Sequence, residues 1–600
     1  MRAVDARLDH GAIGNGRLIA LIAPTTAIEW LCLPRFDSPS VFAALLDRER
    51  GGRFQFLADG AEVRGRASYL ANTNVLRTEL ASGDARWEVL DFAPRVPQAG
   101  GRFDTPLEVI RVVRPLAGTP RVTIDFSPRP DYGRAAGRLL ATQYGVEVLD
   151  AGAPMHLYSN VPGDLICGKG EIFIRQPLYF LLSYGHRVHP PTEAEITALL
   201  EETVRGWRMW SKTCALPSFA AEHVLRSALC LKLHAYVDTG AIIAAATTSI
   251  PEAIGTPRTW DYRYCWLRDA AFVVEALRRL SHLNEGERFI GFLRDVADAG
   301  PLQPLYGVAG ERNLTELVLD HLTGFAGTGP VRIGNAAAEQ QQNDLNGELI
   351  LCLQALLSDP RLVVDRPDEF FPLIERLVEQ AILLAPLADT GIWEFRTLPR
   401  HYTFSRAMCW AAIDRGALIA GRFGRRDLAA RWAAIATEER EIVLRRGFNA
   451  RLGCFTQALD GEHGDAANLL FPSIGLVDAR DPRFLATLDY YGKHMTRGGL
   501  MQRYTNLDDF GATTSAFTIC SLWWAEALAL AGRLDEAIEV FERVVAHANP
   551  LGLFSEDIEP ETGRLLGNFP QAYTHVGLIH AAMTIGALRD ARDGHVRAWT

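Results

Sequence analysis

A glutamate between two aromatic residues is the side chain of this sequence best suited to hold and release a proton. Glu394 stands in the run Gly391-Ile-Trp-Glu-Phe-Arg396, in a loop that separates two helical stretches. Aromatic neighbours disfavour the ionised form of a carboxyl group, as a general acid requires. The alternative is a surface glutamate paired with Arg396, since exposed glutamates are common.

A second glutamate, Glu556, lies far along the chain in the acidic run Leu551-Gly-Leu-Phe-Ser-Glu-Asp-Ile-Glu-Pro560. Its acidic neighbours predict a polar, solvated turn, which suits a carboxylate that has to stay ionised in order to deprotonate water. A purely structural acidic turn is the alternative. Hydrolysis of a glycosidic bond requires one protonated and one ionised carboxyl group on opposite faces of a sugar. The two glutamates are therefore candidates for such a pair.

A third segment, Thr259-Trp-Asp-Tyr-Arg-Tyr-Cys-Trp-Leu-Arg-Asp-Ala270, interleaves four aromatic residues with arginines and aspartates. Flat CH faces of a sugar stack on aromatic rings, and its hydroxyl groups take hydrogen bonds from arginine and aspartate. The segment therefore indicates a carbohydrate site. A purely structural aromatic cluster is the alternative, because aromatic residues also dominate core packing.

The first third of the chain predicts the scaffold of a β-sandwich. Short β-rich runs, punctuated by glycine, proline and aspartate, extend from Arg17 to about Arg187 and favour antiparallel strands. We expect a sandwich domain over residues 1–190 and a linker over 191–216 that holds a helix at 193–211. The clearest runs are Leu18–Ile22, Phe54–Phe56, Leu107–Val113, Val122–Phe126 and Leu178–Leu182.

After about Pro217 the hydrophobic spacing becomes helical. Helices in this number, joined by loops rich in glycine, proline and aromatic residues, favour an (α/α)6 toroid over residues 217–600, with the site built by loops at one rim. The expected fold class is thus multidomain α+β. Helices are expected near 218–236, 269–282, 286–299, 346–358, 369–386, 406–421, 426–447, 482–495, 514–531, 534–547 and 573–588, with shorter pieces near 340 and 468.

Composition narrows the classes of partner. A chain of 600 residues is too long for one hydrophobic core, and its net charge of -10 disfavours a nucleic-acid partner. The nine cysteines are scattered without C-x-x-C spacing, which argues against a disulfide framework or a zinc site. The first residues lack a signal-peptide pattern, and no run of about 18 apolar residues predicts a membrane span. We therefore expect a cytoplasmic protein.

These three segments together resemble the family-15 glycoside hydrolases, the glucoamylase group, and the resemblance runs nearly from end to end. The N-terminal runs Ile13–Gly16 and Glu29–Ser40 are similar to the opening of bacterial members, which carry a β-sandwich before an (α/α)6 barrel. In many glucoamylases the Trp-Glu that carries the acid is followed by another acidic residue. Here Phe395-Arg396 follows it, as in the bacterial relatives.

The resemblance implies a role for individual residues. Glu394 aligns with the general acid and Glu556 with the general base. Predicted sugar-binding residues are Tyr262, Trp266, Arg268, Asp269, Trp393, Arg503 and His401. Arg268 and Asp269 match the pair that binds the hydroxyl groups of the non-reducing glucose in this family. Gln340, Asp344, Gln571 and Tyr573 lie in matching motifs without an assigned role.

The resemblance implies an inverting, exo-acting α-glucoside hydrolase that releases β-glucose from short α-glucans and needs no cofactor or metal. An α,α-trehalase is the close alternative, because bacterial relatives include trehalases. Two further alternatives are a phosphorylase on a similar plan and a catalytically silent sugar sensor; the presence of both glutamates argues against each. The expected partner is a small carbohydrate, with neither nucleic acid nor membrane, and the sequence leaves the oligomeric state open.

Overall fold

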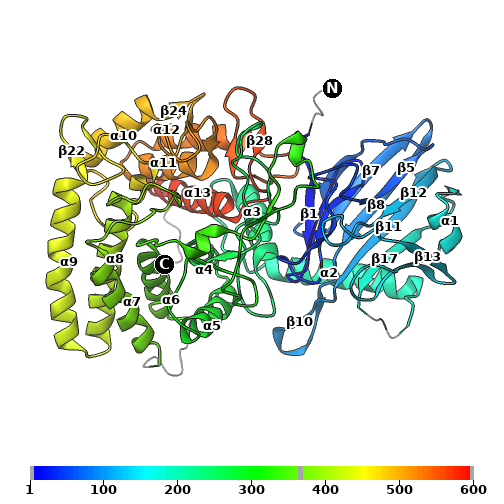
Figure 1. The fold of residues 1–600 in the computed structure, drawn as a ribbon, viewed down its shortest axis with the longest axis horizontal. Helices are drawn as coiled ribbons and strands as arrows, with labels where there is room; N and C mark the ends of the chain where they lie inside the picture. Colours follow the sequence, from blue (N-terminus) through cyan, green and yellow to red (C-terminus); the bar gives the residue numbers. More distant parts are fainter. Residues whose placement is uncertain (1–5, 186, 188, 363–368, 595–600) are drawn as a thin grey trace.

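The computed structural model describes residues 6–185, 187, 189–362 and 369–594. A β-rich part and a helical part lie side by side, with β1 and helix α2 at the junction (Figure 1). This arrangement confirms the predicted fold class, an antiparallel sandwich followed by an (α/α)6 toroid.

Two antiparallel sheets make up the N-terminal part, with the strand orders β1-β2-β3-β5-β12-β16, where β4 pairs with β3, and β13-β14-β15-β17-β11-β8-β7-β6. The first sheet contains β1 (Gly11–Gly14), β2 (Ile19–Ile22), β3 (Ile28–Cys32), β4 (Ser40–Phe42), β5 (Arg53–Ala58), β12 (Arg121–Ser127) and β16 (Glu171–Phe173). The second contains β6 (Arg66–Tyr69), β7 (Leu76–Ser82), β8 (Ala85–Phe92), β11 (Glu108–Ala117), β13 (Leu139–Thr142), β14 (Gly145–Val148), β15 (Met155–Ser159) and β17 (Leu178–Tyr184).

Phenylalanines fill the space between the two sheets. Phe54 and Phe56 alternate on β5 and are fully buried, as expected for the inner face of a pleated strand. Phe54 meets Phe126 of the neighbouring strand and Phe180 of the opposite sheet, at ring-centroid distances of 5.2 and 5.9 Å. Smaller elements flank this core: η1 (Ala99–Gly101), β9 (Val96–Pro97), β10 (Phe103–Asp104) and α1 (Gly163–Cys167).

Helix α2 (Glu193–Ser211) connects the two parts and has the predicted bounds. Thr192 and Glu195 form a capping box at its start, which satisfies backbone N–H groups that would otherwise lack partners. Near its other end, Trp207 is buried beneath the guanidinium of Arg95, whose carbon lies 4.8 Å from the indole ring centroid. The connecting helix is thus packed onto the sandwich rather than freely hinged.

Inner and outer helices alternate in the helical part. Successive inner elements contact one another around a closed ring, in the order α4, α6, α8, η5, α11, α13 and back to α4. The inner elements are α4 (Leu267–Arg279), α6 (Leu345–Leu357), α8 (Thr403–Arg422), η5 (Ala466–Leu470), α11 (Thr518–Leu530) and α13 (Ala572–Arg592). The outer helices are α3 (Ala221–His234), α5 (Asn284–Asp298), α7 (Phe371–Leu384), α9 (Arg426–Arg446), α10 (Pro482–His494) and α12 (Leu534–Val545).

Burial distinguishes the two rings. The inner helix α11 is buried on nearly every side, whereas the outer helix α12 buries one stripe with helical spacing. That stripe consists of Leu534, Ala537, Val540, Phe541 and Val544. An outer helix therefore needs one apolar face, while an inner helix lies between its neighbours and the lumen.

Short strands and turns fill the loops that enter the inner helices. They are β18 (Cys265–Trp266), β19 (Leu305–Tyr306), β20 (Leu317–Val318), β21 (Arg332–Ile333), β22 (Phe448–Asn449), β23 (Cys454–Phe455), β24 (Thr496–Arg497), β25 (Leu500–Met501), β26 (Ala516–Phe517), β27 (Asp557–Ile558) and β28 (Leu565–Leu566). The 3-10 turns are η2 (Phe325–Gly327) and η3 (Ala336–Glu339).

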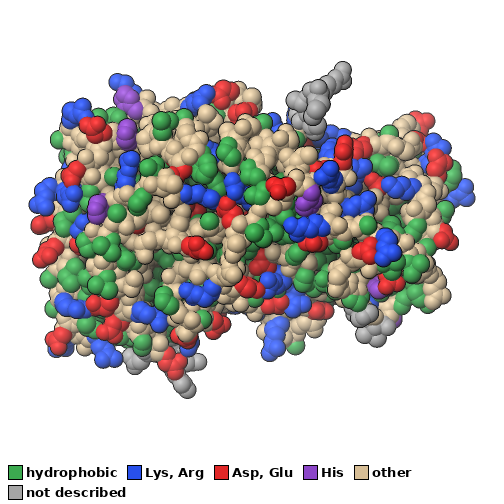
Figure 2. Space-filling model, viewed as in Figure 1, with side chains coloured by type: hydrophobic (Ala, Val, Ile, Leu, Met, Phe, Trp, Pro, Cys, Tyr) green, Lys and Arg blue, Asp and Glu red, His purple; other side chains and the backbone are tan. Residues whose placement is uncertain are grey.

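Basic and acidic side chains are interspersed over the face of the molecule seen in Figure 2, without a large field of one sign. Within the described ranges, none of the helices combines the length and the hydrophobicity needed to cross a bilayer.

Candidate active site

Loops that enter the inner helices at their N-terminal ends enclose one cavity. Both predicted catalytic glutamates and all the predicted sugar-binding residues except His401 line it. The lining residues are Ala244, Tyr262, Trp266, Arg268, Asp269, Ile392, Trp393, Glu394, Arg503, Phe517, Glu556, Gln571 and Tyr573. The toroid thus brings together side chains that are widely separated along the chain.

Glu394 projects from a tight turn that begins at Gly391. Its backbone N–H donates to the Gly391 carbonyl at 3.1 Å, and Glu394 itself has a φ of 60°. Gly391 also has a positive φ, of 67°, and a Cβ there would approach the Tyr402 ring to 2.8 Å, so the turn requires glycine. A non-glycine residue in the left-handed region is uncommon and gathers at functional sites.

Three donors converge on one oxygen of Glu394. Oε1 accepts hydrogen bonds from Trp266 Nε1 at 2.6 Å and from Gln342 Nε2 at 3.1 Å. The guanidinium of Arg268 donates to the same oxygen at 3.3 Å. Arg396, the expected partner of a surface glutamate, instead pairs with Glu316 at 2.7 Å. Glu394 therefore belongs to the cavity, with its orientation set through Oε1.

Glu556 is only 1% exposed, and its neighbour Asp557 is fully buried. The prediction of a solvated acidic turn is therefore wrong, because the loop before α13 is covered by the surrounding loops of the toroid. Tyr262 donates its hydroxyl to Oε1 of Glu556 at 2.8 Å, whereas Oε2 is buried without a hydrogen-bond partner. Gly567 has a φ of 72°, and a Cβ there would come within 2.6 Å of the Glu556 side chain.

Burial raises the pKa of the Glu556 carboxyl well above its usual range, and nearby carboxylates of Glu252 and Asp557 raise it further. The guanidinium of Arg503 acts in the opposite direction. Burial also raises the pKa of Asp557, to about 8. Because the two adjacent carboxyl groups titrate together, a proton bound by one favours ionisation of the other.

Two aromatic side chains connect the glutamates. Tyr262 bonds to Glu556, Trp266 bonds to Glu394, and the two rings meet edge to face with centroids 5.3 Å apart. Both glutamates therefore line the same cavity, each hydrogen-bonded to one member of this aromatic pair.

A buried charged cluster forms another wall of the cavity. Arg268 lies 3.4 Å from Asp269 and 3.4 Å from Asp344. Asp269 is 8% exposed, and its Oδ2, the oxygen that faces Arg268, is buried without a hydrogen bond. Burial raises the pKa of Asp269 to about 6, although Arg268 opposes the shift.

Arg503 is held by a glutamate that sequence reasoning missed. Its guanidinium pairs with Glu252, which also accepts a hydrogen bond of 2.8 Å from the Trp260 indole. Glu252 stands outside the aromatic segment, beside Pro251 in a loop without a recognisable motif. Gln342, a donor to Glu394, was missed for the same reason.

A second, outer cavity meets the inner one at Glu394. Tyr262, Trp393, Glu394 and Arg503 line both. The other residues of the outer cavity are Glu252, Arg258, Trp260, Asn335, Ala337, Gln340, Phe395, Arg396, Tyr504, Asp508, Asp509 and Phe510. Glu394 therefore lies where the two cavities meet.

Ion pairs and stacked rings close the walls of the outer cavity. Arg258 donates to both oxygens of Asp508, at 2.8 and 2.6 Å. The Arg396 guanidinium lies over the Trp260 indole, 4.4 Å from its centroid, and bonds to Glu316. Paired in this way, the charged walls hold fixed positions and present hydrogen-bonding edges next to an aromatic face.

Trp393, beside Glu394, is held in place from behind. Its Nε1 donates to both oxygens of Asp465 at 2.9 Å, and Asp465 also accepts from Gln457 at 3.1 Å. Asp465 is 3% exposed, and burial raises its pKa to about 6. No sequence motif pointed to Asp465, since an aspartate before η5 has the ordinary composition of a helix start.

His401 is the predicted site residue that the structure does not bring to the cavity. Its side chain is exposed, and its carbonyl accepts from the Leu459 backbone at 2.9 Å. His401 is absent from the residues that line either cavity. The sugar contact expected from its motif therefore has no support in the geometry.

The four motif residues to which the sequence assigned no role lie around the same site. Gln571 and Tyr573 line the inner cavity, and Gln340 lines the outer one. Gln340 also donates to the Glu394 carbonyl at 3.1 Å, and Asp344 faces Arg268. In the part of the chain that the structure describes, no group of three or more His, Cys, Asp or Glu side chains is arranged to hold a metal ion.

A toroid with two carboxyl groups, paired arginine and aspartate, and aromatic walls around one cavity defines an O-glycosyl hydrolase. Residues 218–583 match the Glycosyl hydrolases family 15, and the chain belongs to this family. Residues 6–164 match the domain described as Trehalase-like, N-terminal.

Curated relatives cover nearly the whole chain. A protein named "Trehalase" from Mycobacterium tuberculosis is 35% identical over 98% of this chain and 90% of its own length. A "Trehalase" from Thermoplasma volcanium is 34% identical over 96% of this chain and 92% of its own length.

Among solved structures, a bacterial glucoamylase in complex with acarbose is similar with a TM-score of 0.70. The match covers 98% of this chain and 96% of the other, at 14% sequence identity. Similarity at this level establishes the shared fold.

Proposed function

We propose that this protein is an α,α-trehalase, which hydrolyses trehalose to two molecules of glucose. The observation that carries the proposal is the similarity, over both parts of the chain, to proteins named trehalase. The match of residues 6–164 to a trehalase-like N-terminal domain supports it independently of the catalytic motifs.

In the proposed reaction, Glu394 is the general acid and Glu556 the general base. Glu556 takes a proton from water, whose oxygen bonds to the anomeric carbon as the bond from that carbon to the bridging oxygen breaks. Glu394 donates its proton to the bridging oxygen. One glucose leaves with its α configuration and the attacked glucose is released as β, so that one water is consumed for each trehalose.

The convergence of donors on Oε1 supports the role of Glu394. Trp266, Gln342 and Arg268 all bond to that oxygen. Oε2 can then carry the proton toward the substrate. The bond from Tyr262 to Oε1 of Glu556 supports the role of the base, because it fixes this carboxyl group beside the cavity.

The inner cavity suits the glucose that is attacked. Arg268 and Asp269, which form an ion pair, can bind adjacent hydroxyl groups from one side, and Arg503 reaches the cavity from another. Charged groups that are already paired with one another lose little on binding, because their geometry is set in advance.

The outer cavity suits a single leaving glucose. Its walls are tied together by the Arg258–Asp508 and Arg396–Glu316 pairs, and Trp260 supplies a flat face. These cross-connections favour a disaccharide over a long glucan. The glucoamylase-like specificity on short α-glucans, the first expectation from the sequence, becomes the second candidate, because its motifs are shared with trehalases.

A substrate panel tests the proposal. Trehalose, maltose, isomaltose and maltotriose are each supplied to the full chain, and the first products are followed by proton NMR. We expect trehalose to be cleaved with the highest kcat/KM, with equal initial amounts of α- and β-glucose. Preferred cleavage of maltotriose, or initial products that are all α, would overturn it.

A further inference from the structure

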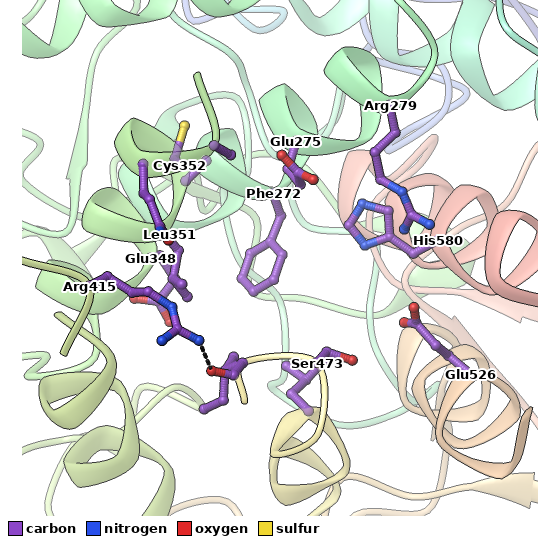
Figure 3. A pocket seen from close by; sticks show the side chains of 15 residues that line it. Phe272, Glu275, Arg279, Glu348, Leu351, Cys352, Arg415, Ser473, Glu526 and His580 are labelled. Atoms are coloured by element: carbon purple, nitrogen blue, oxygen red, sulfur yellow. Dashed lines mark hydrogen bonds between the residues drawn. The ribbon is translucent and has the colours of Figure 1, made fainter. Parts of the chain in front are cut away.

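A separate cavity of about 390 Å³ lies in the lumen of the toroid, toward the C-terminal ends of the inner helices (Figure 3). Helices α4, α6, α8, α11 and α13 all contribute side chains, as does the turn after η5. A water molecule in the liquid occupies about 30 Å³, so this space could hold roughly a dozen. It is far larger than a packing defect in a close-packed interior.

Buried polar groups in this cavity lack partners within the described chain. Both carboxyl oxygens of Glu348 and Nε2 of His580 are buried without a hydrogen bond. Glu348 is only 3% exposed. An unsatisfied buried polar atom is unfavourable by about 1–3 kcal/mol, so a water molecule or a ligand hydroxyl group that reaches these atoms would stabilise them.

Fixed charges around the cavity are already compensated. Glu275 accepts two hydrogen bonds of 2.8 Å from Arg278. Glu526 accepts one of 2.8 Å from the Thr584 hydroxyl, and the positive charge of Arg279, which also lines the cavity, opposes the rise in the Glu526 pKa that burial causes. Arg415 pairs with the adjacent aspartate and donates to the Ile474 carbonyl at 3.0 Å. The walls therefore offer hydrogen bonds rather than an excess charge that would select an ion.

Glu348 has the character of a neutral acid. Burial raises the pKa of its carboxyl well above the usual range, and the nearby Asp344 carboxylate raises it further. A protonated carboxyl group both donates and accepts a hydrogen bond, which matches a hydroxyl group. His580 is likewise kept neutral, since burial lowers its pKa to about 3.

One wall is aromatic. The ring of Phe272 projects into the middle of the cavity, between Glu348 and Arg415 on one side and His580 and Glu526 on the other (Figure 3). A flat apolar face surrounded by hydrogen-bonding groups complements a molecule with an apolar ring face and polar edges.

We propose that this lumen cavity is a second binding site, for a neutral monosaccharide or a cyclic polyol of the same size. The ring of the ligand stacks on Phe272, and its hydroxyl groups bond to Glu348 and His580. Ser473 is exposed and marks the rim by which the ligand enters. The proposal goes beyond the proposed function, because it concerns a site that takes no part in the hydrolysis.

The partition between this site and the catalytic cavity is thin. Phe272 lines the lumen cavity, Tyr573 lines the catalytic one, and their ring centroids are 5.3 Å apart. A ligand in the lumen therefore lies one layer of side chains away from the substrate.

Equilibrium dialysis of D-glucose against the full-length protein, with ligand-observed NMR as a second method, tests the proposal. We expect two equivalents of glucose for the unaltered protein, one in each cavity. A Ser473→Trp variant fills the rim and should bind one, while the matched Ser473→Ala control should bind two. A variant with Arg268→Ala and Asp269→Ala in the catalytic cavity should also bind one.

The outcomes separate the two sites. A single equivalent in the unaltered protein that is lost with Arg268→Ala and Asp269→Ala would overturn the proposal, as would two equivalents in Ser473→Trp. A second variant guards against a folding defect, checked by circular dichroism and Tm. Phe272→Leu keeps an apolar side chain but removes the stacking face, and should weaken the second equivalent by roughly tenfold.

Discussion

The indole of Trp266 donates a hydrogen bond of 2.6 Å to Oε1 of Glu394, so a residue from the loop before α4 orients a carboxyl group from the loop before α8. Removing the donor while keeping an aromatic ring should leave the fold intact and misplace the acid. For Trp266→Phe we expect kcat on trehalose to fall by roughly 10–100-fold with little change in KM, because an oxygen of Glu394 loses one of the donors that orient it. Steady-state kinetics measure it, and an unchanged kcat would contradict the orienting role.

Substitution of the two glutamates should distinguish acid from base. Glu394→Gln is expected to lower kcat on trehalose by roughly 10²–10⁴-fold, but to have much less effect on α-glucosyl fluoride, whose leaving group needs no proton. Glu556→Gln should impair both substrates, because each needs an activated water. Equal losses on both substrates for both variants would contradict the assignment, and unimpaired turnover in either variant would remove that residue from the mechanism.

Asp557 should set the pH at which Glu556 becomes an effective base. Its carboxyl group raises the pKa of Glu556, so Asp557→Asn removes a like charge and favours ionisation of Glu556. The base then loses its proton at a lower pH, and the acid limb of the kcat/KM profile should move down by about one pH unit. The profile is measured on trehalose at constant ionic strength. A limb that stays fixed or moves up would contradict the coupling.

Substitution of Arg396 should affect only substrates that have a leaving sugar. Arg396→Ala removes one wall of the outer cavity and should lower kcat/KM on trehalose by roughly tenfold, the scale of a lost hydrogen bond to a charged group. Hydrolysis of α-glucosyl fluoride, which carries no leaving sugar, should be unaffected. Arg451→Ala provides the control, since Arg451 pairs with Glu462 on the surface with 71% of its side chain exposed. A parallel loss on both substrates would place the effect at the glutamates instead.

Stability should increase as the pH falls from about 8.5 to 6.5. Burial raises the pKa of Asp389 to about 7 and that of Asp557 to about 8, so the folded state binds protons that the unfolded chain releases near pH 4. The free energy of unfolding should therefore rise by about 1–3 kcal/mol over this window. Below pH 6.5 the trend is opposed, because burial lowers the pKa of His282 to about 4 and that of His580 to about 3.

Urea unfolding at several pH values measures this dependence. Asp389→Asn should flatten it, since the substitution removes one titrating group from the fold. A stability that falls from pH 8.5 to 6.5 would show that these carboxyl groups are ionised in the folded protein.

The sequence predicted the scaffold better than the surroundings of the active groups. The helix expected near 426–447 is observed as Arg426–Arg446, because Trp432, Ala436 and Val443 recur at helical spacing and are buried. The short piece expected near 468 is η5, which occupies an inner position of the ring. Hydrophobic periodicity depends only on residues close together in the chain, so helices of this kind can be predicted directly from the sequence.

Burial at the site could not be predicted in this way. The acidic composition around Glu556 indicated a solvated turn, whereas loops from distant inner helices cover it. Glu252, Gln342 and Asp465 bind site residues that are distant from them in the sequence, and such contacts leave no pattern along the chain. The motif that included His401 matched, but the side chain lies outside both cavities.

The short length of η5 affects the part of the toroid that surrounds the lumen cavity. The other inner elements are full helices, whereas Ala466–Leu470 ends after little more than one turn, and Ser473 and Ile474 of the following turn line the lumen cavity. The lumen therefore borders two cavities, the proposed active site at the N-terminal ends of the inner helices and the lumen cavity toward their C-terminal ends. The lumen cavity thus owes part of its boundary to the one inner element that is not a full helix.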